Sequence, residues 1–574
     1  MARQRGMMAL MGALAAGSLY ALGQLTEAHW LSGRSALAVA VLAGVFFGGL
    51  LVTTGPLALR RSILAAAGVA VGVAALVTWA SLRFAAPEGL GGSGLALLSA
   101  LTLASLPWPF AIAAAGMGWR DYPSLFRESW SIVVRVTLAL IFTGIVWLVI
   151  YLSQELLGLV GVPVISVILS YDLAPWLITG TVLGLAMAVT NELADVLSPN
   201  LVLRLFRLLV PVVLVVMTLF LIALPLRGFA TIFGAVSSTA VLLAMTAVAV
   251  TLVTSALDQE DALAASSTLM LQATRLLAAI TSLPAGLAAW ALWLRVADHG
   301  WTPSRLMAAS AVGLGLAYGL AYLVASLGGR HWRERIRQAN ILMALVSMAL
   351  AVLWLSALNP EAIAARSQLA RIADGRTSVA EIDLYALQDW GLAGQAALDQ
   401  LKERAKTDAP LAARLAALQA GQTEVTPDPA ALQRALAAAL PLQPQTPQTE
   451  ALRDRILAGA FPSDLQGWQS RCDAHLPQGG PGCVLVVADF LPVISGDEAM
   501  LFTRSSDGFL MIEGFAFEGG TLTRHPVTSY GGALPGAEAG AALIDQLQKT
   551  PAALAPLSLN QLVLPGQPGL VLSP

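Results

Sequence analysis

The chain has 574 residues, of which 57% are hydrophobic and 12% charged, and its mean hydropathy is +0.72. Soluble proteins carry about 25% charged residues, so this composition excludes a soluble globular protein and predicts that most of the chain faces lipid. Residues 1–358 hold 19 basic and 13 acidic side chains, whereas residues 359–574 hold 14 and 22. The acidic second part argues against nucleic acid as a partner, because phosphate binding needs concentrated positive charge.

Eleven segments of the first part are apolar over about 20 residues, the length that a helix needs to cross a bilayer. They are residues 7–25, 35–54, 62–82, 95–117, 131–151, 173–191, 205–226, 230–256, 268–293, 306–326 and 339–358. The sequence therefore predicts an all-α polytopic membrane bundle of about eleven transmembrane helices over residues 1–358. The first segment also has features of a cleaved signal peptide, but ten further spans favour an uncleaved start.

The arginines predict the orientation of this bundle, because the flanks of spans that stay in the cytoplasm retain basic residues. The densest basic cluster, at residues 330–337, precedes the last span. With a cytoplasmic N-terminus, thirteen arginines fall on inner flanks and five on outer flanks. We therefore expect the N-terminus in the cytoplasm and everything after residue 358 on the other side of the membrane.

Two segments between the spans leave alternatives open. Residues 118–130 mix aromatic and charged side chains at helical spacing, which fits an interfacial amphipathic helix or an ordinary loop with aromatic anchors. Residues 156–170 are apolar, but Gly161 and Pro163 interrupt them, which fits a re-entrant or interfacial piece. If residues 156–170 spanned the membrane, the side on which the later segments lie would change.

Residues 359–574 predict an α+β extracytoplasmic domain. Residues 359–420 have the pattern of a stem of short helices, and residues 421–450, rich in Pro, Gln and Ala, are typical of a linker around one short helix. Residues 451–574 are expected to form a small domain. Its strands, between residues 484 and 524, form an antiparallel sheet, and a helix follows at 538–548.

Cys472 and Cys483 are the two cysteines of the chain and enclose a loop that contains several Gly and Pro. An extracytoplasmic location is oxidising. We therefore expect these cysteines to form a disulfide, which for so short a loop contributes roughly 2–3 kcal/mol.

The sequence offers no pattern typical of catalysis. It has no HExxH, Walker A or paired CxxC motif, and none of its five histidines falls inside a predicted span. Ser93 lies in a glycine-rich loop and not on a strained strand-to-helix turn, so it is not expected to be a nucleophile. We predict no catalytic residue, no cofactor and no metal site, and we regard an enzyme as the least favoured class.

Ionisable side chains within or beside the spans are better candidates, because burying charge in lipid is costly. Arg135 lies inside the fifth span, and Glu192 and Asp195 close the sixth, just before Arg204 and Arg207 open the seventh. An ion-paired cytoplasmic hairpin explains these residues. A polar path into the bundle is the alternative.

The loop from Arg295 to Arg305 is the most distinctive on the predicted outer side. Thr302 is suited to cap the next span, and an aromatic residue is suited to the interface. Capping and anchoring do not explain two arginines where basic residues are otherwise scarce. The alternative is contact with a lipid headgroup or an anionic ligand, for which the candidates are Arg295, Asp298, Trp301 and Arg305.

Two motifs resemble those of a known family. Residues 299–305, His-Gly-Trp-Thr-Pro-Ser-Arg, resemble its Tyr-Gly-Trp-Thr-Pro-x-Arg motif, with His299 in place of Tyr. Residues 359–372, which contain Ser-Gln-x-x-Arg, and the following Asp-Gly-Arg resemble its stem. This is the bacterial family catalogued as domain of unknown function 4153, and the resemblance covers about two thirds of the chain. The family implies a bacterial inner-membrane protein and carries no established activity.

These observations favour an integral inner-membrane protein of the bacterial cell envelope, with a periplasmic C-terminal domain. We expect it to handle or translocate a lipid-linked or amphiphilic substrate. The alternative is a non-transporting scaffold or sensor whose periplasmic domain binds a partner. The expected partners are the lipid bilayer and an envelope protein or lipid-linked molecule, and not nucleic acid.

Overall fold

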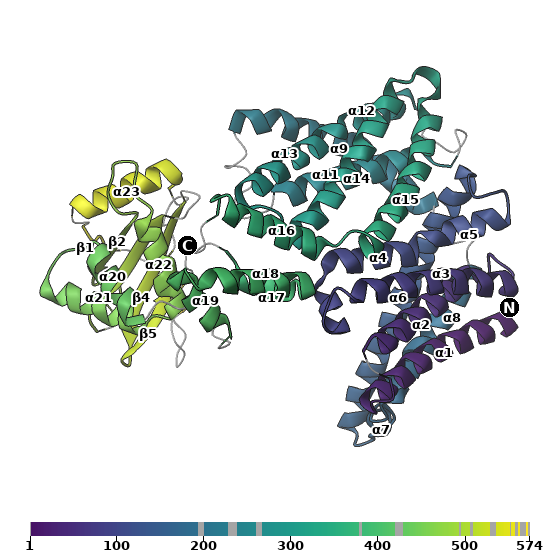
Figure 1. Ribbon diagram of the computed structural model, residues 1–574, viewed down its shortest axis with the longest axis horizontal. Helices are drawn as coiled ribbons and strands as arrows, with labels where there is room; N and C mark the ends of the chain where they lie inside the picture. Colours follow the sequence, from purple (N-terminus) through teal and green to yellow (C-terminus); the bar gives the residue numbers. More distant parts are fainter. Residues whose placement is uncertain are drawn as a thin grey trace. The chain divides into compact units, whose positions relative to one another are not determined.

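The computed structural model describes residues 2–31, 33–192, 200–227, 238–259, 267–377, 382–419, 429–492, 495–504, 509–527, 535–550, 553–556, 561–562 and 570–571. The chain divides into two units, Met1–Ala412 and Ala413–Pro574 (Figure 1). Each unit has hydrophobic clusters of its own.

The first unit is a helical bundle, and eleven spans in its described residues are long and apolar enough to cross a membrane. They are α1 (Ala2–Glu27), α2 (Gly33–Thr53), α3 (Leu59–Ser81), α4 (Gly94–Ser105) with α5 (Pro107–Ala115), α6 (Tyr122–Leu159), α8 (Leu173–Glu192), α9 (Asn200–Arg227), α11 (Ser238–Leu257), α12 (Thr268–Ile280) with α13 (Ser282–His299), α14 (Pro303–Leu327) and α15 (Trp332–Ser356). Each coincides with one predicted span, so the prediction of a polytopic all-α bundle is confirmed.

Two of these spans consist of two helices each. Pro107 has no N–H to continue α4 and instead takes the first position of α5. Between α12 and α13, Thr281 Oγ1 donates to Leu277 O at 2.7 Å and Ser282 Oγ donates to Ala279 O at 3.1 Å. Side-chain hydrogen bonds of this kind compete with the backbone ladder and bend helices.

Helix α6 is longer than the fifth predicted span. It begins at Tyr122, where the Asp121 carboxylate accepts a hydrogen bond from Ser124 N at 3.1 Å, and it continues to Leu159. Residues 122–130 are thus its first turns, neither a separate interfacial helix nor a loop. Residues 156–170 comprise the end of α6 and the six-residue helix α7 (Val164–Leu169). A helix of that length is only about 9 Å long, so this segment adds no span.

Helices α1 and α8 approach each other through glycines. A Cβ atom at Gly184 would lie 2.1 Å from Met8 O, and one at Gly12 would lie 1.9 Å from Gly180 O. Gly180 and Gly184 are four residues apart and therefore share one face of α8. This is the spacing with which small residues let membrane helices pack backbone to backbone.

The polar contacts at the helix ends fall into two groups, as alternating spans require. Arg5 with Glu192, Arg61 with Ala115 O, and Arg207 with Asp258 mark one end. Arg34 with Phe84 O, Ser93 with Glu361, and Leu392 N with Arg83 O mark the other. The N-terminus of α1 lies at the first end and the stem lies at the second, which we call the stem end.

The stem consists of α16 (Pro360–Ala373), α17 (Leu384–Asp389) and α18 (Gly391–Ala405), followed by α19 (Ala409–Gln419), in which the boundary between the two units falls. Asn359 caps α16 by accepting a hydrogen bond from Ala362 N at 3.0 Å. Gly391 begins α18 at φ +57°, and a Cβ there would lie 2.6 Å from Arg83 O. Glycine at this turn therefore permits close packing of the stem on the bundle.

The second unit contains a five-stranded sheet in the order β1-β2-β3-β4-β5. Its strands are β1 (Leu442–Gln443), β2 (Cys483–Ala488), β3 (Glu498–Arg504), β4 (Leu510–Glu518) and β5 (Thr521–His525). Strands β2 to β5 are antiparallel as predicted, but β1 pairs parallel to β2, so the sheet is mixed. A second, two-stranded sheet pairs β6 (Gln561–Leu562) with β7 (Leu570–Val571).

Helices form two hydrophobic clusters with the five-stranded sheet. Helices α20 (Pro429–Ala439), α21 (Pro447–Gly459) and α22 (Pro462–Asp473) contribute to one cluster, and α23 (Ala537–Lys549) contributes to the other. The first cluster includes Leu436 and Trp468, both almost fully buried. Of the stretch predicted as a linker, residues 421–428 lie outside the described residues. The rest contains α20 and β1, which belong to this unit. Cys472 of α22 and Cys483 of β2 form a disulfide.

Candidate functional site

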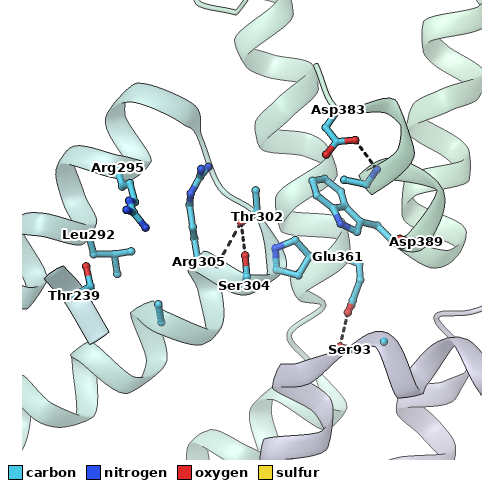
Figure 2. A pocket seen from close by; sticks show the side chains of 15 residues that line it. Ser93, Thr239, Leu292, Arg295, Thr302, Ser304, Arg305, Glu361, Asp383 and Asp389 are labelled. Carbon is cyan, nitrogen blue, oxygen red and sulfur yellow. Dashed lines mark hydrogen bonds between the residues drawn. The ribbon is translucent and has the colours of Figure 1, made fainter. Parts of the chain in front are cut away.

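A cavity of about 630 Å³ lies at the stem end of the first unit (Figure 2). Its lining comes from the start of α4, from the ends of α11, α13 and α14, and from α16 and α17. The lining residues are Gly92, Ser93, Thr239, Leu292, Arg295, Thr302, Pro303, Ser304, Arg305, Ala308, Glu361, Asp383, Ala386, Asp389 and Trp390. Small-molecule sites commonly measure about 300–1,000 Å³, so the cavity is large enough for a ligand.

Two arginines supply positive charge to this cavity. Arg295, near the end of α13, is exposed and makes no hydrogen bond or ion pair with any residue that the structure describes. Arg305, in the first turn of α14, donates from Nη1 to His299 O at 3.1 Å and to Gly300 O at 2.7 Å. A guanidinium has five N–H donors. The Nε and Nη2 donors of Arg305 therefore have no partner within the described chain.

Three carboxylates also line the cavity, on the other side from the arginines (Figure 2). Glu361, in the first turn of α16, is only 3% exposed. Its Oε1 accepts a hydrogen bond from Ser93 Oγ at 2.6 Å, whereas its Oε2 has no partner among the described residues. Asp383 caps α17 by accepting from Ala386 N at 2.9 Å. Asp389 is exposed and makes no hydrogen bond with the described chain.

Arg83, on the bundle side, interacts electrostatically with Glu361. Burial lowers the pKa of the Arg83 guanidinium, and the Glu361 carboxylate acts against that shift. Arg83 Nη2 donates to Ser356 O at 3.5 Å and forms no ion pair with Glu361. Despite this neighbour, one oxygen of the buried carboxylate has no partner in the part of the chain that the structure describes.

Helix α16 binds the turn between α13 and α14, the two helices that carry the cavity arginines. Buried Arg371 donates from Nη1 to Ala297 O at 2.8 Å and from Nη2 to Asp298 O at 2.5 Å. Gln368 Nε2 donates to His299 O at 3.1 Å and to Trp301 O at 2.9 Å. The last carbonyls of a helix lack partners in the helix itself, and a cation is favoured there. We call these contacts the α16 clamp, because they fix the end of α13.

The structure brings some of the predicted site residues together and separates others. Arg295 and Arg305 line the cavity. Asp298 and Trp301 do not line it; their backbone carbonyls bind the α16 clamp, and Trp301 N donates to Ser367 Oγ at 3.1 Å. Their contribution in the structure is to the position of the loop.

Arg135 and Glu192 lie at the opposite end of the bundle from the cavity. Buried Arg135 donates from Nη1 to Asn191 Oδ1 and from Nε to Ser131 O at 3.2 Å. Glu192 pairs with Arg5 at 2.5 Å. Asn191 links this group to the α2 end by donating to Thr54 O at 3.1 Å. Asp195 lies outside the described residues.

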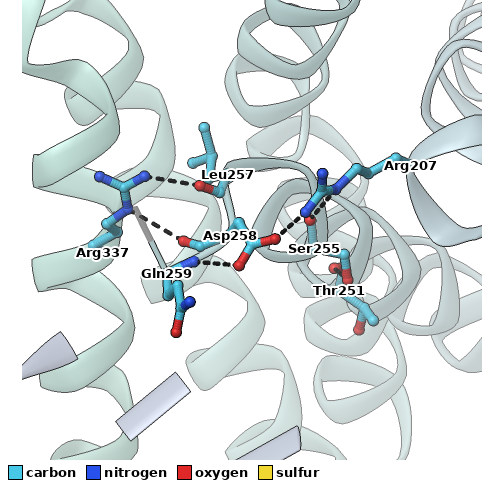
Figure 3. Close-up of polar contacts among 7 residues, drawn as sticks. All are labelled: Arg207, Thr251, Ser255, Leu257, Asp258, Gln259 and Arg337. Atoms are coloured by element: carbon cyan, nitrogen blue, oxygen red, sulfur yellow. Dashed lines mark hydrogen bonds and ion pairs between the residues drawn. The ribbon is translucent and has the colours of Figure 1, made fainter. Parts of the chain in front are cut away.

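Arg207 forms an ion pair with Asp258 (Figure 3). Asp258 follows α11 with φ +52° and is 3% exposed. Arg207 Nε donates to Ser255 O at 3.1 Å, and Arg337 Nη2 donates to Leu257 O at 2.8 Å. These contacts join α9, α11 and α15. Glu192 and Arg207, two residues of the predicted ion-paired hairpin, thus form ion pairs with Arg5 and Asp258, which lie outside it. The hairpin itself stays a prediction, because Asp195 lies outside the described residues.

The acidic side of the cavity was not predicted from the sequence. Glu361 follows Asn359-Pro360 in the first turn of a helix, where an acidic residue usually complements the helix dipole, so its position gave no sign of a ligand site. Asp383 and Asp389 lie in a polar stem. Among the described residues, no group of three or more His, Cys, Asp or Glu could hold a metal ion.

A family model described as "Domain of unknown function (DUF4153)" matches residues 7–401. The chain belongs to this family. The DUF4153 match includes the membrane bundle, every cavity-lining residue and the α16 clamp, and it ends before the second unit. The two motifs that predicted the family contact each other in the clamp. Comparison with curated proteins and with solved structures gave no match.

Proposed function

We propose that this DUF4153 protein is an integral protein of the bacterial inner membrane that binds an amphiphilic or lipid-linked molecule and handles or translocates it. The headgroup would bind in the cavity at the stem end. The observation that carries this proposal is the pair Arg295 and Arg305, whose unengaged donors line a cavity at the ends of apolar spans.

The lining of the cavity changes from charged to less polar along the helices. Arg295 and Arg305 lie at the ends of α13 and α14, whereas Leu292 and Ala308 lie about one turn further along the same helices, towards the middle of the span. A molecule with a charged head and an apolar body matches this change. Planar guanidinium groups bind phosphate in a bidentate manner, and phosphate is the common anionic group of membrane lipids.

The start of α14 adds to the attraction for an anion. Thr302, Pro303 and Ser304 line the cavity, so the N-terminal end of this helix faces it. The helix dipole places partial positive charge at that end. The arginines and the dipole therefore act in the same direction.

The proposed location places the stem end and the second unit in the periplasm. The basic cluster at residues 330–337 lies at the start of α15, at the opposite end of the bundle, which suits the cytoplasm. A disulfide in the second unit suits an oxidising compartment.

The test compares lipid binding by matched double variants. Purified, delipidated protein is titrated in detergent with total bacterial phospholipid, and bound lipid is counted by native mass spectrometry. Arg295→Ala with Arg305→Ala should weaken binding at least about tenfold, because each charge-assisted hydrogen bond contributes roughly 1.5–3 kcal/mol and 1.4 kcal/mol is a factor of ten.

The control is Arg60→Ala with Arg330→Ala, which removes the same charge from exposed positions outside the cavity. This variant should bind lipid like the wild type. Equal loss in both double variants, or no loss in either, would contradict a headgroup site at Arg295 and Arg305.

A scaffold or sensor is the second candidate function. The observation that favours it is the second unit, which has its own core and disulfide and lies outside the family match. A protein partner that co-purifies with the full chain, and is lost when residues 413–574 are removed, would support this candidate if the cavity variants retain the partner.

A further inference from the structure

We propose that the cavity is built for a zwitterionic head: a phosphate at the two arginines, joined by a short link to a primary ammonium at the carboxylates. This inference rests on the proposed function and narrows its ligand. The shared chemistry is that of phosphoethanolamine, carried either by a membrane lipid or by a soluble phosphoamine.

The two walls of the cavity bear opposite charges. Arg295 and Arg305 lie on one side, and Glu361, Asp383 and Asp389 lie on the other (Figure 2). None of these arginines forms an ion pair with any of these carboxylates. A purely anionic ligand would meet three carboxylates, and a purely cationic one would meet two arginines. Complementary potential therefore requires a ligand that carries both charges.

Glu361 indicates which kind of cation the cavity would bind. Glu361 is only 3% exposed, its Oε1 accepts a hydrogen bond from Ser93 Oγ at 2.6 Å, and its Oε2 has no donor among the described residues. Leaving a buried acceptor unsatisfied is unfavourable. A primary ammonium has three N–H donors, whereas a quaternary ammonium has none. The unpaired Oε2 thus favours a primary amine, which can donate to it, over a choline-type head.

Trp390 and Asp389 complete the carboxylate side. Both line the cavity; Trp390 is buried, and Asp389 is exposed without a hydrogen bond to the described chain. An indole face attracts any cation. Trp390 would therefore bind a primary and a quaternary ammonium alike. Selection between primary and quaternary amines then falls to Glu361.

The experiment measures preference among headgroups with the full-length protein. Delipidated protein in detergent is titrated separately with phosphatidylethanolamine, phosphatidylcholine and phosphatidylglycerol of identical acyl chains, and with water-soluble glycerophosphoethanolamine. We expect phosphatidylethanolamine to bind at least about tenfold more tightly than the other two lipids, a difference of about 1.4 kcal/mol. Equal or weaker binding of phosphatidylethanolamine overturns the zwitterion inference.

The variants separate this inference from the proposed function. Glu361→Gln should abolish the preference for phosphatidylethanolamine while phosphatidylglycerol still binds, because both arginines remain. The control Asp172→Asn removes an exposed carboxylate outside the lining and should keep the preference. If Glu361→Gln does not fold, exposed Asp389→Asn serves instead, with a smaller loss of preference expected. An unchanged preference in the substituted protein overturns the inference.

Three further outcomes distinguish a failure of the zwitterion inference from a failure of the proposed function. If phosphatidylglycerol binds as tightly as phosphatidylethanolamine and the arginine variant loses both, the zwitterion inference fails and the proposed function stands. If no lipid binds but glycerophosphoethanolamine does, the zwitterion inference stands with a soluble ligand, and the amphiphile proposal fails. If nothing binds, both fail.

Discussion

Arg371 shows how one buried side chain positions a loop. Burying a charge is costly unless its donors are used, and this guanidinium uses them on Ala297 O, Asp298 O and Thr377 Oγ1. Gly300 has φ +72°, and a Cβ there would lie 2.5 Å from Arg371 Cδ, so glycine lets the arginine approach. The cavity arginines therefore depend on a stem residue that does not line the cavity.

At this position, Arg371→Met should lower the melting temperature of the detergent-solubilised protein by at least about 5 °C. Two helix-end carbonyls and a hydroxyl would lose their donor, at a cost of roughly 1–3 kcal/mol each if they stay dry. Thermal unfolding followed by circular dichroism gives the measurement. Arg366→Met, an exposed change on the same helix, should shift the melting temperature by less than about 1 °C. Similar shifts in both variants would show that the clamp is not stabilising.

Residue by residue, the sequence identified one side of the cavity and not the other. Arg295 and Arg305 stood out because basic residues are scarce on that side of the bundle. Glu361, Asp383 and Asp389 resembled ordinary helix-start and stem residues. Only the folding of the stem onto the bundle brings them opposite the arginines, and no local pattern encodes that approach.

Among the helices, α1 and α8 depend most visibly on residue size. Gly184→Ala should destabilise the protein, because the added Cβ would lie 2.1 Å from Met8 O and the two backbones must separate. We expect the melting temperature to fall by at least about 5 °C. Gly144→Ala makes the same change in α6, where nothing lies within 4 Å, and should leave stability unchanged or raise it slightly. An equal fall in the melting temperature of both variants would contradict this explanation of the α1–α8 contact.

Elements whose identity depends on length and hydropathy were predicted well. All eleven spans followed from apolar runs, because a bilayer sets one required length. Strand β1 was not predicted, because two residues beside Pro444 are too few to show the alternating pattern of a strand. The start of α6 was missed because its polar first turns belong to a helix that continues past the apolar stretch. The parts that failed are those decided by tertiary packing.

For the whole molecule, the proposed orientation puts the N-terminus in the cytoplasm and the stem in the periplasm. A cysteine introduced by Lys549→Cys should react with a membrane-impermeant thiol reagent in intact cells. One introduced by Arg330→Cys should react only after lysis. The described chain has no free cysteine, so the unaltered protein is the blank. If only the Arg330→Cys protein were labelled in intact cells, the proposed orientation would be wrong.

The length of α6 has a consequence for the surrounding lipid. Its 38 residues extend about 57 Å at 1.5 Å per residue, whereas the hydrocarbon layer is about 30 Å thick. Large apolar side chains remain exposed as far as Leu156 and Leu159 near its end. Lipid beside this helix must thicken, or the helix must tilt. Without a tilt that shortens its span, α6 would therefore surround itself with a thicker annulus of acyl chains than the other helices.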